Sequence, residues 1–187
     1  MKTNNRKDEI IKACIRMMCE KGAGLSSMQA IADEVGIAKG TLYFYFDSKE
    51  TLYNEVFDYC HKLDVEACNA NLEQYDNAID KLCKRFKNII EHVIAYPEEA
   101  KVENMISQYP MYQKESYKKD FTDAIREILR QGIEQDEIKD MPAWLLAELY
   151  YGITMSMYMK FVHNPDLWND ETIRENCCQF IRDSLKK

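Results

Sequence analysis

Residues 26–52 have the sequence SSMQAIADEVGIAKGTLYFYFDSKETL, which predicts two short helices around a tight turn and the start of a third helix. In the first helix, Ile31, Ala32 and Val35 form one apolar stripe of the kind that a packed helix needs. Gly36 follows directly, at a position where a helix ends and where glycine adopts a positive φ at little cost. The segment therefore predicts a helix–turn–helix.

The second helix of this pair has one side for the core and one for the outside. Leu42 and Phe46 lie four residues apart and are expected to be buried. At about 100° per residue, the opposite side carries Gly40, Thr41, Tyr43 and Phe44. A glycine, a threonine and two aromatic rings are unusual on a solvated face but suit a surface that contacts another molecule. A helix–turn–helix that presents its second helix outward fits the major groove of B-DNA.

The flanking residues mark the ends of these helices. Ser26 and Gln29 have the spacing of a capping box that starts the first helix, and Asp47 and Glu50 have the spacing of one that starts the third. Lys49 then lies in the first turn of the third helix, where a cation opposes the helix dipole. A DNA phosphate beside Lys49 would offset this cost. The alternative is an ordinary solvated lysine.

One set of positions in this segment keeps a fixed spacing: Ser27, Ile31, Ala32, Gly36, Ile37, Gly40, Thr41, Leu42, Tyr43, Phe46, Lys49, Glu50 and Leu52. This pattern resembles the DNA-binding signature of the TetR family of bacterial transcriptional regulators. The resemblance covers roughly the first quarter of the chain. The residues that follow show no fixed motif, and the resemblance implies a second domain that varies with the ligand.

The resemblance implies that the helix at 39–46 enters the major groove of an operator. The residues expected closest to the DNA are Lys39, Gly40, Thr41, Tyr43 and Phe44. Those expected to hold phosphates or reach a base edge beside it are Ser27, Gln29, Tyr45 and Lys49. Many family members carry histidine where this chain has Tyr45. A tyrosine hydroxyl can still donate a hydrogen bond, so the role is weakened and not lost.

The charge of the chain is unevenly distributed. The 187 residues carry a formal net charge of −7, which by itself argues against binding to nucleic acid. Residues 1–52, however, hold eight Lys and Arg against seven Asp and Glu, so the acidic excess lies in the remainder. A balance of +1 is modest. We therefore expect DNA affinity to depend on binding as a dimer and to fall steeply with salt.

The periodicity of the whole chain predicts an all-α fold, with an N-terminal three-helix DNA-binding domain and a larger helical domain for ligand binding and dimerisation. The expected helices lie at about 4–21, 28–35, 39–46, 48–70, 76–95, 97–107, 113–135, 142–162 and 170–185. We place the domains at 1–50 and 51–187. The boundary then lies within or beside a continuous helix, which can carry a shift of the large domain to the DNA-binding helices.

Residues 144–161 are apolar on nearly all sides, so this helix must be covered on both sides. One side suits its own domain and the other suits a partner subunit. With the amphipathic helix at 170–185, the resemblance implies a four-helix dimer interface. The residues expected there are Ala147, Gly152, Ser156, Ile173, Cys177, Phe180 and Ile181. The alternative is a central helix in a monomeric bundle.

The large domain also carries candidate ligand-binding residues. Methionine and tyrosine side chains adapt to apolar guests, and tyrosine hydroxyls orient them. The candidates are Met105, Tyr109, Tyr112, Phe121, Tyr150, Met155 and Tyr158. The alternative for each of them is a place in the core.

Other chemistry finds little support in the residues. The three histidines lie far apart without metal-ligand spacing, and we expect no metal, no cofactor and no catalytic site. The seven cysteines fit small buried side chains in a reducing cytoplasm, although the adjacent pair Cys177 and Cys178 leaves a redox role open. No apolar run approaches a membrane span, and we expect a cytosolic protein.

The sequence thus predicts a homodimeric, ligand-responsive transcriptional repressor of the TetR type. It would bind a pseudo-palindromic operator with half-sites roughly 34–36 Å apart and be released by a small apolar or amphipathic effector. The alternative is a helical carrier or enzyme for a hydrophobic small molecule, without DNA binding. Activation instead of repression also stays open, and the residues name neither the effector nor the operator.

Overall fold

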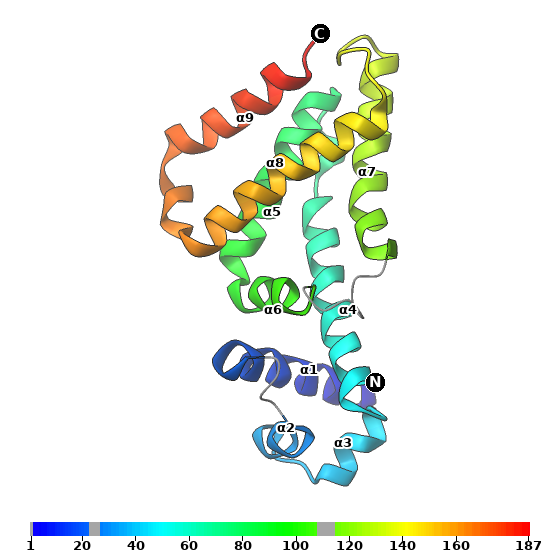
Figure 1. The fold of residues 1–187 in the computed structure, drawn as a ribbon, viewed down its shortest axis with the longest axis vertical. Coiled ribbons are helices and arrows are strands. Elements are labelled where there is room, and N and C mark those ends of the chain that lie inside the picture. The colour runs from blue at the N-terminus through cyan, green and yellow to red at the C-terminus, as the bar shows by residue number, and fades with distance from the viewer. Residues whose placement is uncertain (1, 23–26, 108–114) are drawn as a thin grey trace. The chain divides into compact units, whose positions relative to one another are not determined.

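The computed structural model describes residues 2–22, 27–107 and 115–187. Within these ranges the chain forms nine α-helices and no β-sheet, apart from one isolated antiparallel bridge between Ile138 and Lys186. The expected all-α fold is confirmed. The helices are α1 (Lys2–Lys21), α2 (Met28–Val35), α3 (Lys39–Tyr45), α4 (Lys49–Cys68), α5 (Ala78–Ala95), α6 (Pro97–Ser107), α7 (Glu115–Glu134), α8 (Ala143–His163) and α9 (Glu171–Leu185), with short 3-10 turns η1 (Leu72–Gln74) and η3 (Pro165–Asn169) (Figure 1).

The chain divides into two compact units. The first comprises Met1–Leu63 and Pro97–Gln113, and the second comprises Asp64–Tyr96 and Lys114–Lys187. The boundary therefore falls inside α4, and α6 joins the first unit. The predicted functional boundary near residue 50 concerns which part binds DNA, and it stays a prediction.

The helix–turn–helix of the first unit is built by a serine cap and a glycine turn. The Ser27 hydroxyl accepts a hydrogen bond from the Ala30 N–H at 3.1 Å and caps α2. Gly36 ends α2 with φ of 69°, a left-handed conformation that costs most residues energy. The Ile37 N–H then bonds to the Ala32 carbonyl at 2.9 Å, which fixes the turn before α3 begins at Lys39.

Both predicted capping boxes need correction. The Gln29 amide donates to the Asp33 carboxylate at 2.7 Å instead of closing a box at the helix start, and Ser26 lies outside the described residues. At α4 the cap is Ser48, whose hydroxyl accepts from the Thr51 N–H at 3.0 Å, one residue after the predicted Asp47. In both places a neighbouring serine hydroxyl serves as the cap.

The remainder of the first unit packs α1 against α2 and α6. Ile10, Cys14 and Met18 of α1 are fully buried. The Lys101 ammonium of α6 donates to the Cys19 carbonyl at the end of α1 at 3.0 Å. His61 of α4 lies 3.1 Å from the Glu103 carboxylate of α6, and this pair is largely buried. Helix α6 is thereby held to both α1 and α4.

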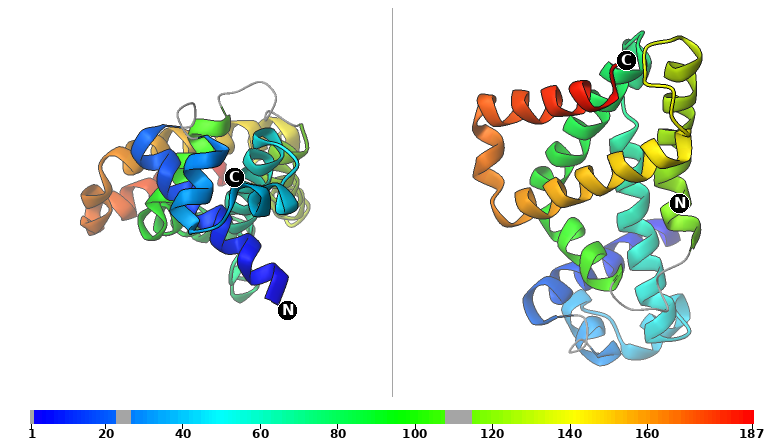
Figure 2. Two further views of the ribbon diagram at one scale, coloured as in Figure 1. Left: turned by 90° about the horizontal axis from the view of Figure 1, so that it is seen from below. Right: turned by 45° about the horizontal axis from the view of Figure 1, so that its top comes forward.

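In the second unit α5 is the central helix and contacts α7, α8 and α9. Its residues Leu82, Phe86 and Ile90 are fully buried. Figure 2 shows α8 and α9 meeting at the η3 connection and diverging from it, with α5 beside both. The Trp168 ring of η3 packs edge-on against the Phe86 ring at a centroid distance of 5.9 Å and closes this end of the core.

The turn at Gly36 gives a stability prediction. Gly36→Ala is expected to lower the free energy of unfolding by about 1–2 kcal/mol, because alanine is strained at this positive φ. A Cβ there would meet no atom within 4 Å, so crowding adds nothing to the cost. Gly36→Asn should cost less, since asparagine tolerates this conformation. Urea denaturation of the three proteins measures the effect, and equal stability of Gly36→Ala and the parent would contradict it.

Candidate nucleic-acid interface and ligand pocket

Helix α3 is buried on one side only. Leu42 is 0% exposed and Phe46, directly after the helix, is 1% exposed. On the other side Phe44 is 78% and Tyr43 is 42% exposed, and Gly40 and Thr41 are exposed as well. The predicted division of this helix into a core side and an outward side is confirmed. Whether the outward side contacts DNA stays a prediction.

Two lysines bring positive charge to this region. The Lys39 ammonium lies 5.9 Å from the centroid of the Tyr43 ring, and the Lys49 ammonium lies 5.0 Å from that of Tyr53. Both distances fit cation–π contacts, which hold the lysine side chains without neutralising their charge. Lys49 is the first residue of α4, so its charge adds to the positive end of that helix dipole.

The remaining predicted DNA-contact residues differ in their exposure and in the contacts that their side chains already make. Ser27 and Gln29 are exposed, but their polar atoms already bond within α2, to Ala30 and Asp33. Tyr45 is half-buried, and its ring meets that of Phe44 edge-on at 5.4 Å.

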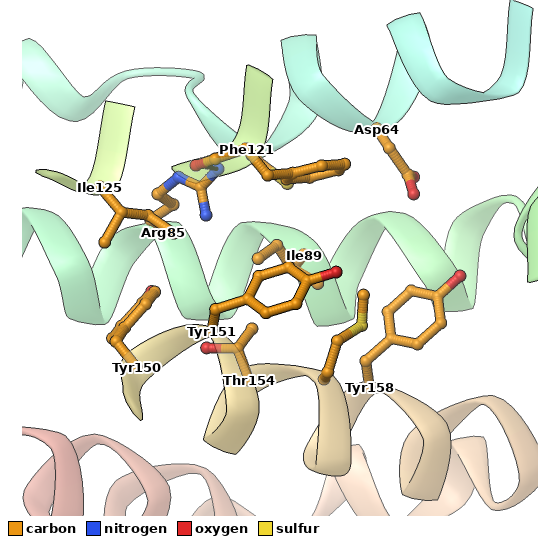
Figure 3. Close-up of a pocket in the computed structure, with 11 residues that line it drawn as sticks. Asp64, Arg85, Ile89, Phe121, Ile125, Tyr150, Tyr151, Thr154 and Tyr158 are labelled. Atoms are coloured by element: carbon orange, nitrogen blue, oxygen red, sulfur yellow. Dashed lines mark hydrogen bonds between the residues drawn. The ribbon is translucent and has the colours of Figure 1, made fainter. Parts of the chain in front are cut away.

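A pocket of about 350 Å³ lies in the second unit, between the last turns of α4 and the helices α5, α7 and α8 (Figure 3). Nearly all of its surface is apolar. The lining residues are Asp64, Cys68, Arg85, Ile89, Phe121, Ile125, Tyr150, Tyr151, Thr154, Met155 and Tyr158.

The structure brings four of the predicted ligand-binding residues together in this pocket: Phe121, Tyr150, Met155 and Tyr158. Met105 is not among the lining residues, because α6 belongs to the first unit and packs there against α1. Tyr109 and Tyr112 lie outside the described residues.

Sequence analysis missed the polar groups of the pocket, above all Arg85. This arginine is 1% exposed, although it carries a full charge. Its Nε donates to the Asn69 side-chain oxygen at 3.2 Å and its Nη2 to the Phe121 carbonyl at 3.4 Å. The signal in the sequence was an arginine within the apolar stripe of α5, beside Leu82 and Phe86.

The other polar groups of the pocket are held by neighbours. The Tyr150 hydroxyl donates to the Leu82 carbonyl at 2.8 Å, and burial raises the pKa of Tyr150, so this tyrosine stays neutral. An Asp64 oxygen lies 2.8 Å from Nε2 of His92. Asp64 and Arg85 therefore face different partners within one pocket.

Helices α8 and α9 leave an apolar surface uncovered in the second unit. Trp144 is 60%, Leu149 52% and Phe180 57% exposed. An open groove beside Phe180 is lined by Phe86, Ile153, Met157, Ile173, Asn176, Cys177 and Ile181 as well. Exposed apolar patches of this kind mark interaction sites.

The residues predicted for the dimer interface do not all lie on this surface. Gly152, Ser156 and Phe180 are exposed, and Ile173 and Cys177 are partly exposed. Ala147 is 0% and Ile181 3% exposed, so the structure packs both inside their own unit, on the inner sides of α8 and α9. Ile181 also lines the groove beside Phe180, and the dimer interface itself stays a prediction.

The cysteines are all free, and five of the seven are buried. Burial raises the pKa of Cys14 to about 12, which keeps it a neutral thiol. Cys178 is buried and Cys177 partly exposed. Among the described residues no group of three His, Cys, Asp or Glu side chains is placed to hold a metal ion, and no helix is long and apolar enough to span a membrane.

The outward side of α3 and the lysines beside it are positioned by a helix–turn–helix. Residues 10–56 match the family model described as bacterial regulatory proteins, tetR family. Over these residues the chain is similar to the DNA-binding region of this family of transcriptional regulators.

Two relatives and one solved structure show how far the likeness extends. An uncharacterized HTH-type transcriptional regulator of Bacillus subtilis, YerO, is 43% identical over 56 residues, which cover 30% of this chain and only 19% of YerO. The fatty acid metabolism regulator protein of B. subtilis is 27% identical over 168 residues, 86% of each chain. The transcriptional regulator FadR from B. subtilis, solved with stearoyl-CoA, has a TM-score of 0.82 at 20% identity, covering 94% of this chain and 97% of FadR. Its likeness shows the shared fold.

Proposed function

We propose that this chain is a homodimeric transcriptional repressor whose α3 lies in the major groove of a pseudo-palindromic operator. The observation that carries this proposal is the outward side of α3, where Tyr43 and Phe44 are held in solvent although both are large and aromatic. Lys39, Gly40 and Thr41 complete the surface that would face the bases. Regulation is through a small molecule bound in the second unit.

Phosphate contacts beside α3 would come from the N-terminal ends of α2 and α4. Lys49 and the positive end of the α4 dipole together suit a phosphate. Ser27, Gln29 and Tyr45 stand at the edges of the same surface. The Ser27 and Gln29 side chains would have to share or exchange the hydrogen bonds that they make within α2.

The proposal is tested directly at Tyr43. Tyr43→Ala is expected to abolish specific operator binding and to leave the dimer and its stability intact, because Tyr43 is exposed on the outward side of α3. Tyr75→Ala removes a comparably exposed tyrosine from the second unit and should bind DNA like the parent. Fluorescence anisotropy with labelled operator measures affinity. Unchanged affinity of Tyr43→Ala would remove Tyr43 from the interface, and no salt-sensitive retention of the parent on DNA would favour a helical carrier or enzyme.

Gly40 gives a second test, because nothing within the chain explains a glycine there. A Cβ at Gly40 would meet no atom within 4 Å, and alanine is the better helix former. Gly40→Ala should therefore keep or slightly raise the melting temperature. If α3 lies against DNA, the added methyl group should weaken operator binding about tenfold or more, by preventing close approach. Parent-like DNA affinity of a stable Gly40→Ala protein would contradict close approach at this residue.

Dimerisation is proposed through the uncovered faces of α8 and α9. Two copies of this pair would bury Phe180 and Leu149, and the small exposed residues Gly152 and Ser156 allow close helix approach. The resulting four-helix interface accounts for an apolar surface that a monomer would leave in water.

The dimer proposal predicts the effect of a charge at Phe180. Phe180→Glu should convert the dimer to a monomer, because burying a carboxylate in an apolar interface is costly. Phe44→Glu alters an even more exposed phenylalanine and should stay dimeric while losing DNA binding. Sedimentation equilibrium gives the mass of each. A Phe180→Glu dimer as tight as the parent would place the interface elsewhere.

The pocket of the second unit is the proposed effector site. Its apolar lining with a few polar groups suits a small apolar or amphipathic molecule. The likeness to a fatty acid metabolism regulator and to a regulator solved with stearoyl-CoA supports such an effector. Asp64 and Cys68 of the pocket stand on α4, the helix that begins at Lys49, so one continuous helix serves both sites. A coupling of about 1–3 kcal/mol would suffice for release.

A further inference from the structure

Arg85 is the least expected group in the effector pocket. It is among the largest fully buried side chains of the chain, in a pocket whose surface is nearly all apolar. A buried cation is strongly unfavourable unless an anion or several hydrogen bonds compensate it.

The described part of the chain supplies only partial compensation. No carboxylate among the described side chains forms an ion pair with Arg85. Its two hydrogen bonds, to Asn69 and to the Phe121 carbonyl, use Nε and Nη2. A guanidinium group has five N–H donors, so Nη1 and a second N–H on Nη2 are left for another partner. Within the described ranges the guanidinium charge meets no anion, and it lies 5.7 Å from the centroid of the Phe121 ring.

A second polar group lies near the same end of the pocket. The Thr154 side chain is buried, and its hydroxyl oxygen has no hydrogen-bond partner of good geometry within the described residues. The Thr154 hydroxyl lies close to Tyr150, where it lowers the tyrosine pKa that burial raises. Figure 3 shows the hydroxyl of Thr154 on the Tyr150 side of the pocket, the side on which Arg85 also lies. Arg85, which keeps N–H donors beyond its two hydrogen bonds, and the Thr154 hydroxyl thus lie on the same side of the pocket.

The rest of the pocket is suited to an apolar group. Figure 3 places Arg85 and Asp64 towards opposite ends, with Ile89 and Phe121 between them, and Met155 adds to the apolar lining. Asp64 and its partner His92 make the far end unfavourable for a second anion. The pocket therefore has one position for an anionic group, beside Arg85.

We propose that the effector is an organic acid with an apolar tail, whose carboxylate binds the Arg85 guanidinium and the Thr154 hydroxyl. The proposal rests on the proposed function for its regulatory meaning, and it specifies the chemical class of the effector. Arg–carboxylate pairing is short, charge-assisted and often bidentate, which explains an arginine in place of a lysine at this site.

The experiment compares decanoate with decanol and with decyltrimethylammonium, which share the tail and differ in the charge of the head group. Isothermal titration calorimetry of the full chain without DNA gives each affinity. Decanoate should bind at least about tenfold more tightly than decanol, and the cation should not bind. Equal binding of decanoate and decanol would overturn the proposal with the parent protein alone.

Two variants test whether Arg85 and Thr154 cause the preference for decanoate over decanol. Arg85→Met keeps the length of the side chain and removes the charge, and it should bind decanoate roughly 10- to 100-fold more weakly while binding decanol like the parent. Thr154→Val should lose several-fold for decanoate only, and it keeps the test available if Arg85→Met does not fold. Lys84→Met is the matched control, because it removes one positive charge from α5 at a partly exposed position outside the pocket.

The outcomes separate this proposal from the proposed function. Parent-like decanoate binding by a folded Arg85→Met protein would overturn the inference, even if the protein binds DNA. Decanoyl-CoA has no free carboxylate, so tighter binding of this thioester with the same loss in Arg85→Met would assign Arg85 to a phosphate and also overturn it. Operator affinity of the ligand-free parent is measured separately, and its absence would contradict the proposed function while leaving the ligand result in place.

Discussion

The structure of the first unit depends on the burial of two side chains, Leu42 and Phe46, four residues apart on one side of a single short helix. A helix of seven residues anchored in this way cannot also bury its other side. The cap at Ser27 and the left-handed turn at Gly36 fix how α2 leads into it. Tyr43 and Phe44 are exposed as a consequence of this anchoring, and two exposed aromatic rings support the proposed contact with another molecule.

In the second unit the main constraint is the burial of one central helix, α5. Helix α5 is surrounded by α7, α8 and α9 and carries the core, so a charged residue on its buried side is hard to accommodate. Arg85 is nevertheless there, facing a pocket and not a carboxylate. Sites that violate the packing rules of the surrounding core are often functional, and this one carries the proposal for the effector.

The sequence predicts structure best where the spacing of apolar residues fits only one orientation of a helix. The helices and the two sides of α3 followed from the positions of Gly36, Leu42 and Phe46. The observed caps, Ser27 and Ser48, each lie one residue after the predicted cap, because neighbouring polar side chains compete for the same N–H groups. The sequence did not predict that Ala147 is buried within its own unit, because a helix that is apolar on all sides does not show which side faces the core. Arg85 was missed because the apolar stripe of α5 was treated as core alone.

The central claim is that two outward α3 helices, related by a two-fold axis, lie against DNA. It is tested most directly by selecting bound sequences from a random DNA pool with the full chain. The account predicts enrichment of inverted half-sites with centres one helical turn apart, about 10–10.5 base pairs. Enrichment of a single unrepeated site, or no enrichment at low salt, would contradict it.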